Sequence, residues 1–288
     1  MKSVVLFLGL FIASLAPISA APLKVASLST ITTDIAKNVG GDDVSITGIV
    51  KPGVDPHEFQ PSPGDIKTVS ESDVVLLTGK GIEGYLSKLK EDGGNALFVD
   101  TGKAFPSLHM VDDGKNVEDP HWWHSIENVK IATGEVEKAF AQADPAHAKD
   151  YATNAQKYLA QLSDLEDWAK VKISELPRDK RKLVTSHDAF QYFARDFSFK
   201  IYSIEGVSSE DEPSSKKVAD LIDTIKSQGV KAVFFENIEN PKVIQEITRE
   251  TGAKIGGELY ADGLGYKQAT TYIEMEKYNI STIVDALK

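Results

Sequence analysis

A chain of 288 residues is long enough for one large domain or two lobes of ordinary size, and 41% hydrophobic residues suffice to build buried cores. Its formal net charge of −11, from 43 acidic and 32 basic residues, argues against nucleic acid as a partner, because phosphate backbones bind basic surfaces. Cysteine is absent, which excludes disulfides, thiolate metal sites and cysteine nucleophiles, so any metal site must use His, Asp and Glu.

The first twenty residues have the three parts of a secretory signal peptide. A basic start at Lys2 precedes an apolar run over 4–15, and small residues end the segment at Ala20. The apolar run is shorter than the roughly 20 residues that cross a bilayer. We therefore interpret 1–20 as a cleaved signal, and since no cysteine can carry a lipid, we expect a mature protein that is free in the periplasm.

Strands and helices are predicted to alternate from residue 21 to residue 143. Ser62 followed by Pro63 is a typical helix start, and Gly40-Gly41 is a typical helix end. Repeated strand–helix units predict an α/β lobe with a parallel sheet flanked by helices. The pattern favours strands at 23–28, 44–50, 74–77 and 96–99, and helices at 30–39, from 63 onwards and at 126–141.

One long helix is predicted over 144–176, because no proline or glycine lies between Pro145 and Pro177. Its apolar residues keep helical spacing, and at about 1.5 Å per residue it would be on the order of 45 Å long. An ordinary surface helix is the alternative. A rigid connection between two lobes explains the length better.

The alternation resumes in 177–288, which predicts a second α/β lobe. Strands are expected at 182–185, 200–204, 232–235 and 253–256, and a final helix from about 266 to 287. The predicted fold class is therefore α/β, with two lobes that each contain a parallel sheet flanked by helices, joined by the long helix.

Four candidate metal ligands lie in four separate loops, two in each lobe. They are His57, His121, His187 and Asp262. Ligands of open parallel sheets bind outside the carboxyl ends of the strands, so we expect these side chains to meet in the cleft between the lobes. Imidazole and carboxylate groups suit a divalent transition metal, and four of them can coordinate zinc tetrahedrally.

The residues beside these four are weaker candidates for a role in the metal site. Asp55 and Asp119 begin identical D-P-H triplets and either orient the histidines or cap local turns. His124 is interpreted as a supporting or structural residue, and Glu58 as a solvated carboxylate. The pair Trp122–Trp123 either walls the cleft or packs in a core.

Together these motifs resemble the metal-specific solute-binding proteins of bacterial ABC transporters for zinc and manganese. The resemblance covers the mature chain and implies two lobes joined by one long helix, with His57, His121, His187 and Asp262 as ligands. It also implies a membrane permease as partner, powered by a separate ATPase, and no enzymatic activity of this chain. We expect a monomer. The motifs are P-G-x-D-P-H-E-F-x-P-S-P-x-D at 52–65, D-P-H at 119–121, T-S-H-D-A-F-x-Y-F at 185–193, G-V-S-S-E-D-E-P-S at 206–214 and L-Y-A-D at 259–262.

The third ligand position favours zinc over manganese. Manganese-binding members of the family usually carry Glu there, whereas this chain has His187, and imidazole-rich sites bind zinc more tightly than manganese. Two departures keep manganese or mixed specificity open. The segment 101–118 lacks the His-rich loop of many zinc members, and D-P-H continues as W-W-H-S-I instead of a W-L-D-P type sequence.

Two other classes of protein fit parts of the sequence. A secreted zinc hydrolase could use three His and one Asp, with Glu58 or Glu205 as base, but four protein ligands leave no position for the reacting water. A protein for an organic solute would need an Arg clamp, and no Arg lies in these loops. The sequence therefore predicts capture of Zn(II), with manganese as the alternative, and delivery to a permease.

Overall fold

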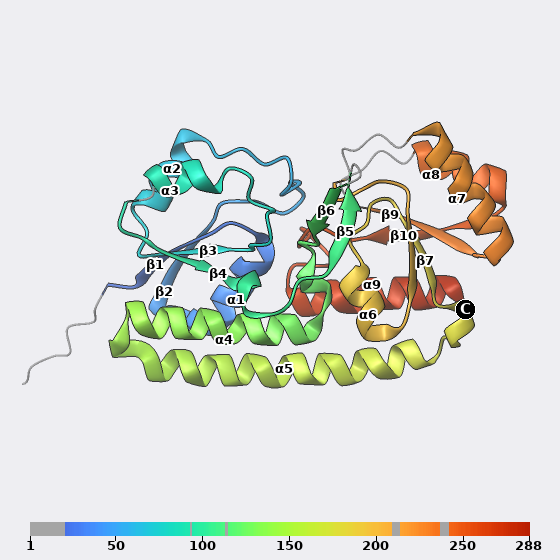
Figure 1. The fold of residues 1–288 in the computed structure, drawn as a ribbon. Helices are drawn as coiled ribbons and strands as arrows, with labels where there is room; N and C mark the ends of the chain where they lie inside the picture. Colours follow the sequence, from blue (N-terminus) through green and yellow to red (C-terminus); the bar gives the residue numbers. More distant parts are fainter. Residues whose placement is uncertain (1–20, 93, 113–114, 209–213, 237–241) are drawn as a thin grey trace, which may run out of the picture.

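The computed structural model describes residues 21–92, 94–112, 115–208, 214–236 and 242–288. The predicted signal peptide and part of the 206–214 motif lie outside the described residues. Two α/β lobes lie side by side, and one long helix runs beneath both (Figure 1). Within the described ranges, no helix is both long and apolar enough to cross a membrane.

The N-terminal lobe contains a four-stranded parallel sheet in the order β2-β1-β3-β4. Helices α1 and α4 cover one face of this sheet, and α2 and α3 cover the other. Strand β3 is buried along its whole length, as its continuous apolar run predicts. The elements are β1 (Leu23–Ser27), α1 (Thr30–Gly40), β2 (Val44–Gly48), α2 (Pro63–Ser70), β3 (Val74–Leu77), α3 (Leu86–Asp92) and β4 (Leu97–Asp100).

Helices α4 (Ile126–Ala143) and α5 (Ala148–Ser174) run antiparallel, α4 beneath the N-terminal lobe and α5 beneath both lobes (Figure 1). The expected long helix is confirmed, although it begins at Ala148 instead of 144, because Pro145–His147 form a separate 3₁₀ turn. Its 27 residues span about 40 Å. Helix α5 packs against α1 and α4 of the first lobe and α9 of the second, so one continuous core extends through both.

The C-terminal lobe contains two parallel strand pairs, β7-β8 and β10-β9, with β7 lying against β9. Its final helix begins at Tyr272, so the expected start near 266 was wrong. Thr271 caps this helix, and Thr271 and Glu274 form a capping box. The elements are β7 (Lys182–Thr185), α6 (Gln191–Phe197), β8 (Lys200–Ser203), α7 (Ser215–Gln228), β9 (Ala232–Glu236), α8 (Lys242–Thr251), β10 (Lys254–Leu259) and α9 (Tyr272–Leu287).

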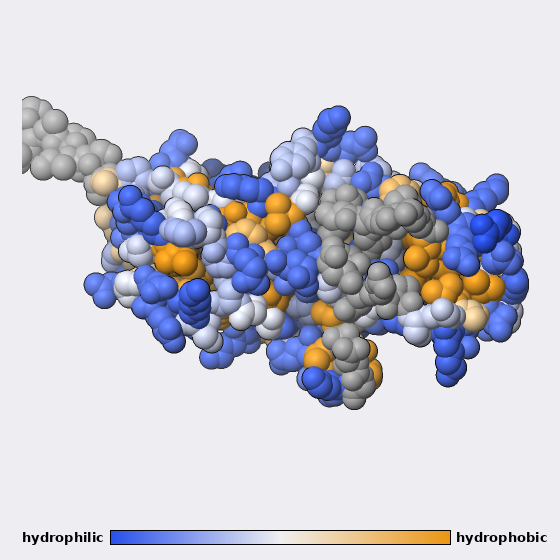
Figure 2. Space-filling model, turned by 90° about the horizontal axis from the view of Figure 1, so that it is seen from above, coloured by the Kyte–Doolittle hydropathy of each residue, from blue (hydrophilic) through white to orange (hydrophobic). Residues whose placement is uncertain are grey.

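A short antiparallel hairpin between the lobes was not expected. It consists of β5 (His109–Asp112) and β6 (Lys115–Glu118), with Met110 opposite Val117. Seen from above, hydrophilic residues cover most of the visible surface, and hydrophobic residues form separate patches (Figure 2). The large hydrophobic side chains that are exposed in the described ranges come from five different segments: Val54, Val111, Val171, Ile255 and Tyr266.

Candidate metal centre

The structure brings the four predicted side chains together between the lobes. One ligand atom each from His57, His121, His187 and Asp262 lies within 4.8 Å of the other three. His57 follows β2, His187 follows β7 and Asp262 follows β10, while His121 lies in the segment that leads from the hairpin to α4. The sheets thus deliver three of the four groups at the carboxyl ends of strands, as expected for this class of fold.

The spacing of the four atoms fits a single ion. Distances from His121 Nε2 to His57 Nε2, His187 Nε2 and Asp262 Oδ1 are 3.2, 3.3 and 3.5 Å. Asp262 Oδ1 lies 3.4 Å from His57 Nε2 and 3.3 Å from His187 Nε2. A tetrahedral ion with bonds of about 2.0–2.1 Å holds its ligand atoms roughly 3.3–3.4 Å apart. The cluster therefore has the size and the donor set of a transition-metal site.

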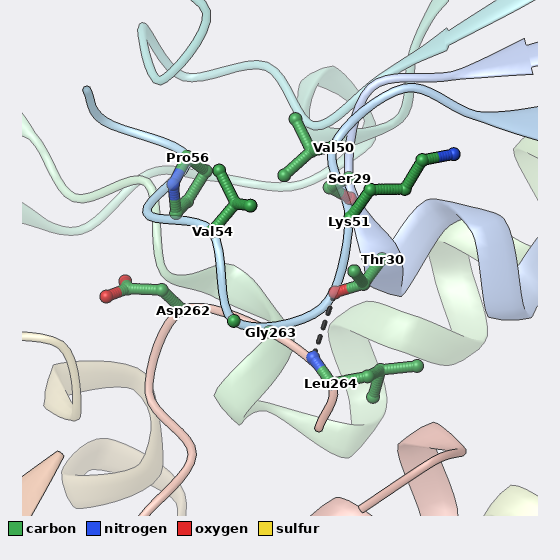
Figure 3. Close-up of a pocket in the computed structure, with 10 residues that line it drawn as sticks. Ser29, Thr30, Val50, Lys51, Val54, Pro56, Asp262, Gly263 and Leu264 are labelled. Atoms are coloured by element: carbon green, nitrogen blue, oxygen red, sulfur yellow. Dashed lines mark hydrogen bonds between the residues drawn. The ribbon is translucent and has the colours of Figure 1, made fainter. Parts of the chain in front are cut away.

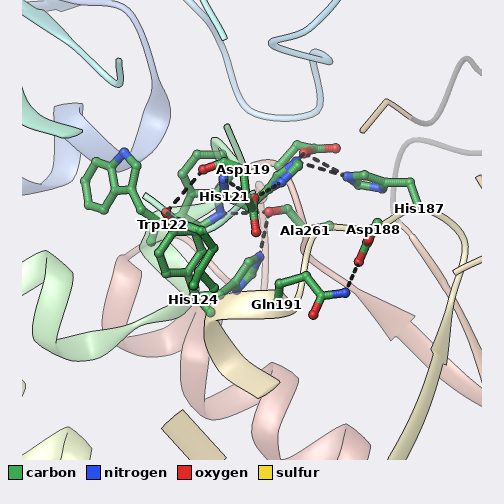
Figure 4. Close-up of polar contacts among 12 residues, drawn as sticks. Asp119, His121, Trp122, His124, His187, Asp188, Gln191 and Ala261 are labelled. Atoms are coloured by element: carbon green, nitrogen blue, oxygen red, sulfur yellow. Dashed lines mark hydrogen bonds and ion pairs between the residues drawn. The ribbon is translucent and has the colours of Figure 1, made fainter. Parts of the chain in front are cut away.

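Two of the imidazoles are oriented by carboxylates behind them. Asp119 Oδ1 lies 2.8 Å from His121 Nδ1 (Figure 4). Glu236 Oε2 forms an ion pair with His187 Nδ1. All four of these residues are at most 1% exposed. A proton held between each Nδ1 and its carboxylate leaves the Nε2 lone pair directed at the cluster, which is the arrangement that metal-binding histidines need.

The buried charges shift the proton affinities of the cluster. Burial alone would lower the pKa of the His187 imidazole, but Glu236 and Asp262 raise it well above its usual range. Burial would also lower the pKa of His121, but Asp119 and Asp262 raise it above its usual value. Burial would raise the pKa of Asp262, but His187, His121 and His57 hold it well below its usual range. The cluster thus favours an ionised aspartate and positive charge around it.

Of the residues beside the ligands, Asp119 and Asp55 bond to histidines of the cluster, and Glu58 and His124 lie outside it. Asp119 orients His121, as one interpretation held, whereas Asp55 caps a turn by accepting a 2.7 Å hydrogen bond from the backbone N–H of His57. Glu58 is exposed and lies outside the cluster. His124 is fully buried outside the cluster.

Glu236 is a site residue that sequence reasoning missed. Its signal was a charged residue at the end of the apolar run Ala232–Phe235, which is the position where ligands of parallel sheets gather. No motif surrounds it, so its pairing with His187 became visible only once β9 was placed beside β7.

Two cavities are each lined by one member of the cluster. One of about 410 Å³ is lined by His57 together with Ile82, Pro120 and Val207. The other is lined by Asp262, Gly263 and residues of the first lobe, and its volume of about 10 Å³ is too small for more than one water (Figure 3). Of these two openings, only the one beside His57 has room for a hydrated ion.

The sequence of the chain matches one family of known proteins. The family described as zinc-uptake complex component A, periplasmic (ZnuA), matches residues 25–286. The chain is 35% identical over 275 residues to the manganese-binding lipoprotein MntA of Bacillus subtilis, covering 92% of this chain and 90% of that protein. It is 33% identical over 270 residues to the iron-binding protein YfeA of Yersinia pestis, covering 92% and 86%.

A solved structure agrees with these sequence matches. The periplasmic zinc-binding protein TroA from Treponema pallidum has a TM-score of 0.86 to this chain at 28% identity, covering 93% of this chain and 99% of that one. The fold, the buried cluster of three histidines and one aspartate and the family match agree, and they set aside the hydrolase alternative. The chain therefore belongs to the ZnuA family, the metal-binding, extracytoplasmic solute-binding proteins of ABC importers.

Proposed function

We propose that this protein captures manganese, alone or with zinc, in the periplasm and delivers it to the permease of an ABC importer. Its ligands are His57, His121, His187 and Asp262. The observation that carries this proposal is the buried convergence of three imidazole nitrogens and one carboxylate oxygen at the spacing of a single ion.

The choice of manganese departs from the zinc preference expected from His187. Relatives that match nine-tenths of the chain are named for manganese and iron, which supports the manganese or mixed alternative better. Glu236 and Asp119 make the imidazoles of His187 and His121 more basic and add negative charge around the ion, which strengthens the binding of either divalent metal.

Zinc is the second candidate, on a specific observation. Distances of 3.2–3.5 Å between ligand atoms match the bond lengths of tetrahedral zinc. Intrinsic affinity also ranks zinc above manganese in any nitrogen and oxygen site.

Metal analysis combined with uptake measurements tests the proposal. Untagged protein from periplasmic extracts is expected to carry about one metal ion per chain, and Asp262→Ala to carry none, while Glu58→Gln, which changes an exposed carboxylate, retains it. Cells that lack the gene should lose manganese uptake and regain it on complementation. Unaffected manganese uptake with a loss of zinc uptake would reverse the ranking, and wild-type protein that retains no metal would overturn the proposal.

A further inference from the structure

The segment Trp122–His124, directly after His121, is bonded to both lobes, and Figure 4 shows His124 beside Ala261 of the second lobe. The indole Nε1 of Trp122 donates to the carbonyl of Thr78 in the first lobe at 3.0 Å. The indole Nε1 of Trp123 donates to the carbonyl of Ala261 in the second lobe at 2.8 Å. The two tryptophans therefore bond this segment to different lobes, and the carbonyl that accepts from Trp123 belongs to the residue before Asp262.

His124 adds a second bond to the same carbonyl. Its Nε2 donates to the Ala261 oxygen at 2.8 Å, and its Nδ1 lies 3.2 Å from Glu276 Oε1 on α9. Both side chains are at most 1% exposed, and the imidazole stacks on Phe190 with the ring centroids 4.3 Å apart. Because Nε2 must carry a hydrogen to reach the carbonyl, Nδ1 and the Glu276 carboxyl share one proton.

Asp262 depends on its backbone more than His121 and His187 do. His121 and His187 each have a carboxylate behind them, but Asp262 Oδ2 has no hydrogen-bond partner in the described part of the chain, and Oδ1 faces the three imidazoles. The carboxylate is therefore placed by the path of its own main chain. A carbonyl has two lone pairs, and Trp123 and His124 use both at Ala261.

The other end of this loop is held by the first lobe. The backbone N–H of Leu264 donates to Thr30 Oγ1 at 2.9 Å (Figure 3). Gly263 between them has a φ of +155°, and a Cβ there would lie 2.4 Å from Thr30 Oγ1. The loop that carries Asp262 is thus fixed before and after the aspartate.

We propose that His124 and Glu276 are positioning residues for Asp262, which set where its carboxylate meets the metal through the Ala261 carbonyl. The inference rests on the proposed function. Burying an ionisable pair costs about as much desolvation energy as the pair returns, so apolar residues of similar size often stabilise a fold as well or better. Placement of the aspartate therefore accounts for this pair better than stability of the fold does.

The test replaces the pair with apolar side chains in the full chain. His124→Leu combined with Glu276→Leu is expected to fold with a urea midpoint close to that of the wild type. Its dissociation constant for Mn(II) should rise roughly 10–100-fold, the usual effect of removing an outer support of a metal site. With Co(II) as probe, the visible absorption spectrum should change, because its bands report the geometry of the ligands.

Two single variants serve as controls. His147→Leu breaks a different histidine–carboxylate pair, with Asp144 between α4 and α5, and should leave affinity and the cobalt spectrum unchanged. Glu276→Gln keeps a hydrogen-bonding partner for His124 and should retain most of the affinity. If the double variant does not fold, Trp123→Phe removes the other donor to Ala261 and is read by the same two measurements.

The outcomes separate the two proposals. A double variant with the wild-type Mn(II) affinity and cobalt spectrum would reduce His124 and Glu276 to packing residues and overturn the inference. Wild-type protein that binds neither ion would instead overturn the proposed function, and the inference with it.

Discussion

The imidazole of His187 lies between two carboxylates, Asp262 within the cluster and Glu236 behind it. This environment makes His187→Glu a direct test of metal choice. We expect the zinc affinity to fall and the preference for manganese over zinc to rise, because a carboxylate is a harder ligand than an imidazole. Competition titrations with both ions measure the ratio. Since Glu236 would then face a second carboxylate, His187→Glu with Glu236→Gln is the matched control, and an unchanged ratio in both would contradict the expectation.

Metal affinity is expected to fall as the pH is lowered. The pKa values of His187 and His121 are raised in the metal-free protein, so their protons compete with the ion at neutral pH and not only below the usual histidine value of about 6.5. Calorimetry in buffers of different ionisation enthalpy should detect release of protons on binding. An affinity that is constant between about pH 5 and 8 would contradict this.

The same shifts fix the sign of the pH dependence of stability. A histidine whose pKa is raised by folding stabilises the metal-free protein fully below its unfolded value, and this contribution is lost as the pH rises through the folded value. The metal-free protein should therefore lose stability toward alkaline pH, as urea unfolding at several pH values would show.

At the scale of single residues, the site residues that lie in motifs could be predicted from the sequence, and those outside motifs could not. His57 and His121 stand in D-P-H triplets, and His187 directly follows an apolar strand. Glu236 and Glu276 support the site from β9 and α9, and no local pattern marks either. Their roles depend on which elements are neighbours in space, which a linear pattern does not state.

At the scale of the elements, α5 offers a sharp test of packing. Leu162 is fully buried in the core that joins the lobes, so Leu162→Ala should lower the free energy of unfolding by about 2–5 kcal/mol. Val171 lies on the same helix but is 68% exposed, so Val171→Ala should change it by less than about 0.5 kcal/mol. Urea denaturation of the metal-free proteins gives both values. Equal effects would mean that α5 is not held by its buried face.

The end of a helix was predicted well where it requires a backbone conformation that one residue type adopts easily. Gly41 ends α1 with a φ of +56°, as the glycine pair indicated. The start of α9 was placed too early, because the capping box of Thr271 and Glu274 was not used as a start signal. The hairpin β5-β6 was missed since strands of four residues carry too little periodicity to stand out from a loop.

For the whole molecule, α5 limits how far the lobes move apart. It packs against α1 and α4 in one lobe and α9 in the other without a break. We therefore expect the radius of gyration from X-ray scattering to change little when metal is removed with a chelator, with loop shifts in place of hinge opening. A large increase, of the kind produced by a wide opening of two lobes, would show that α5 bends or detaches.

The four members of the cluster are not equally accessible, and this has a consequence for unloading. His57 alone among them is only partly buried and borders the cavity of about 410 Å³, whereas Asp262 borders only the opening of about 10 Å³, and His121 and His187 are fully buried. An ion that arrives through this opening bonds to His57 first, and an ion that departs through it breaks that bond last. We therefore expect the loop after β2 to influence how long the ion stays bound, because it carries the last ligand that a departing ion leaves.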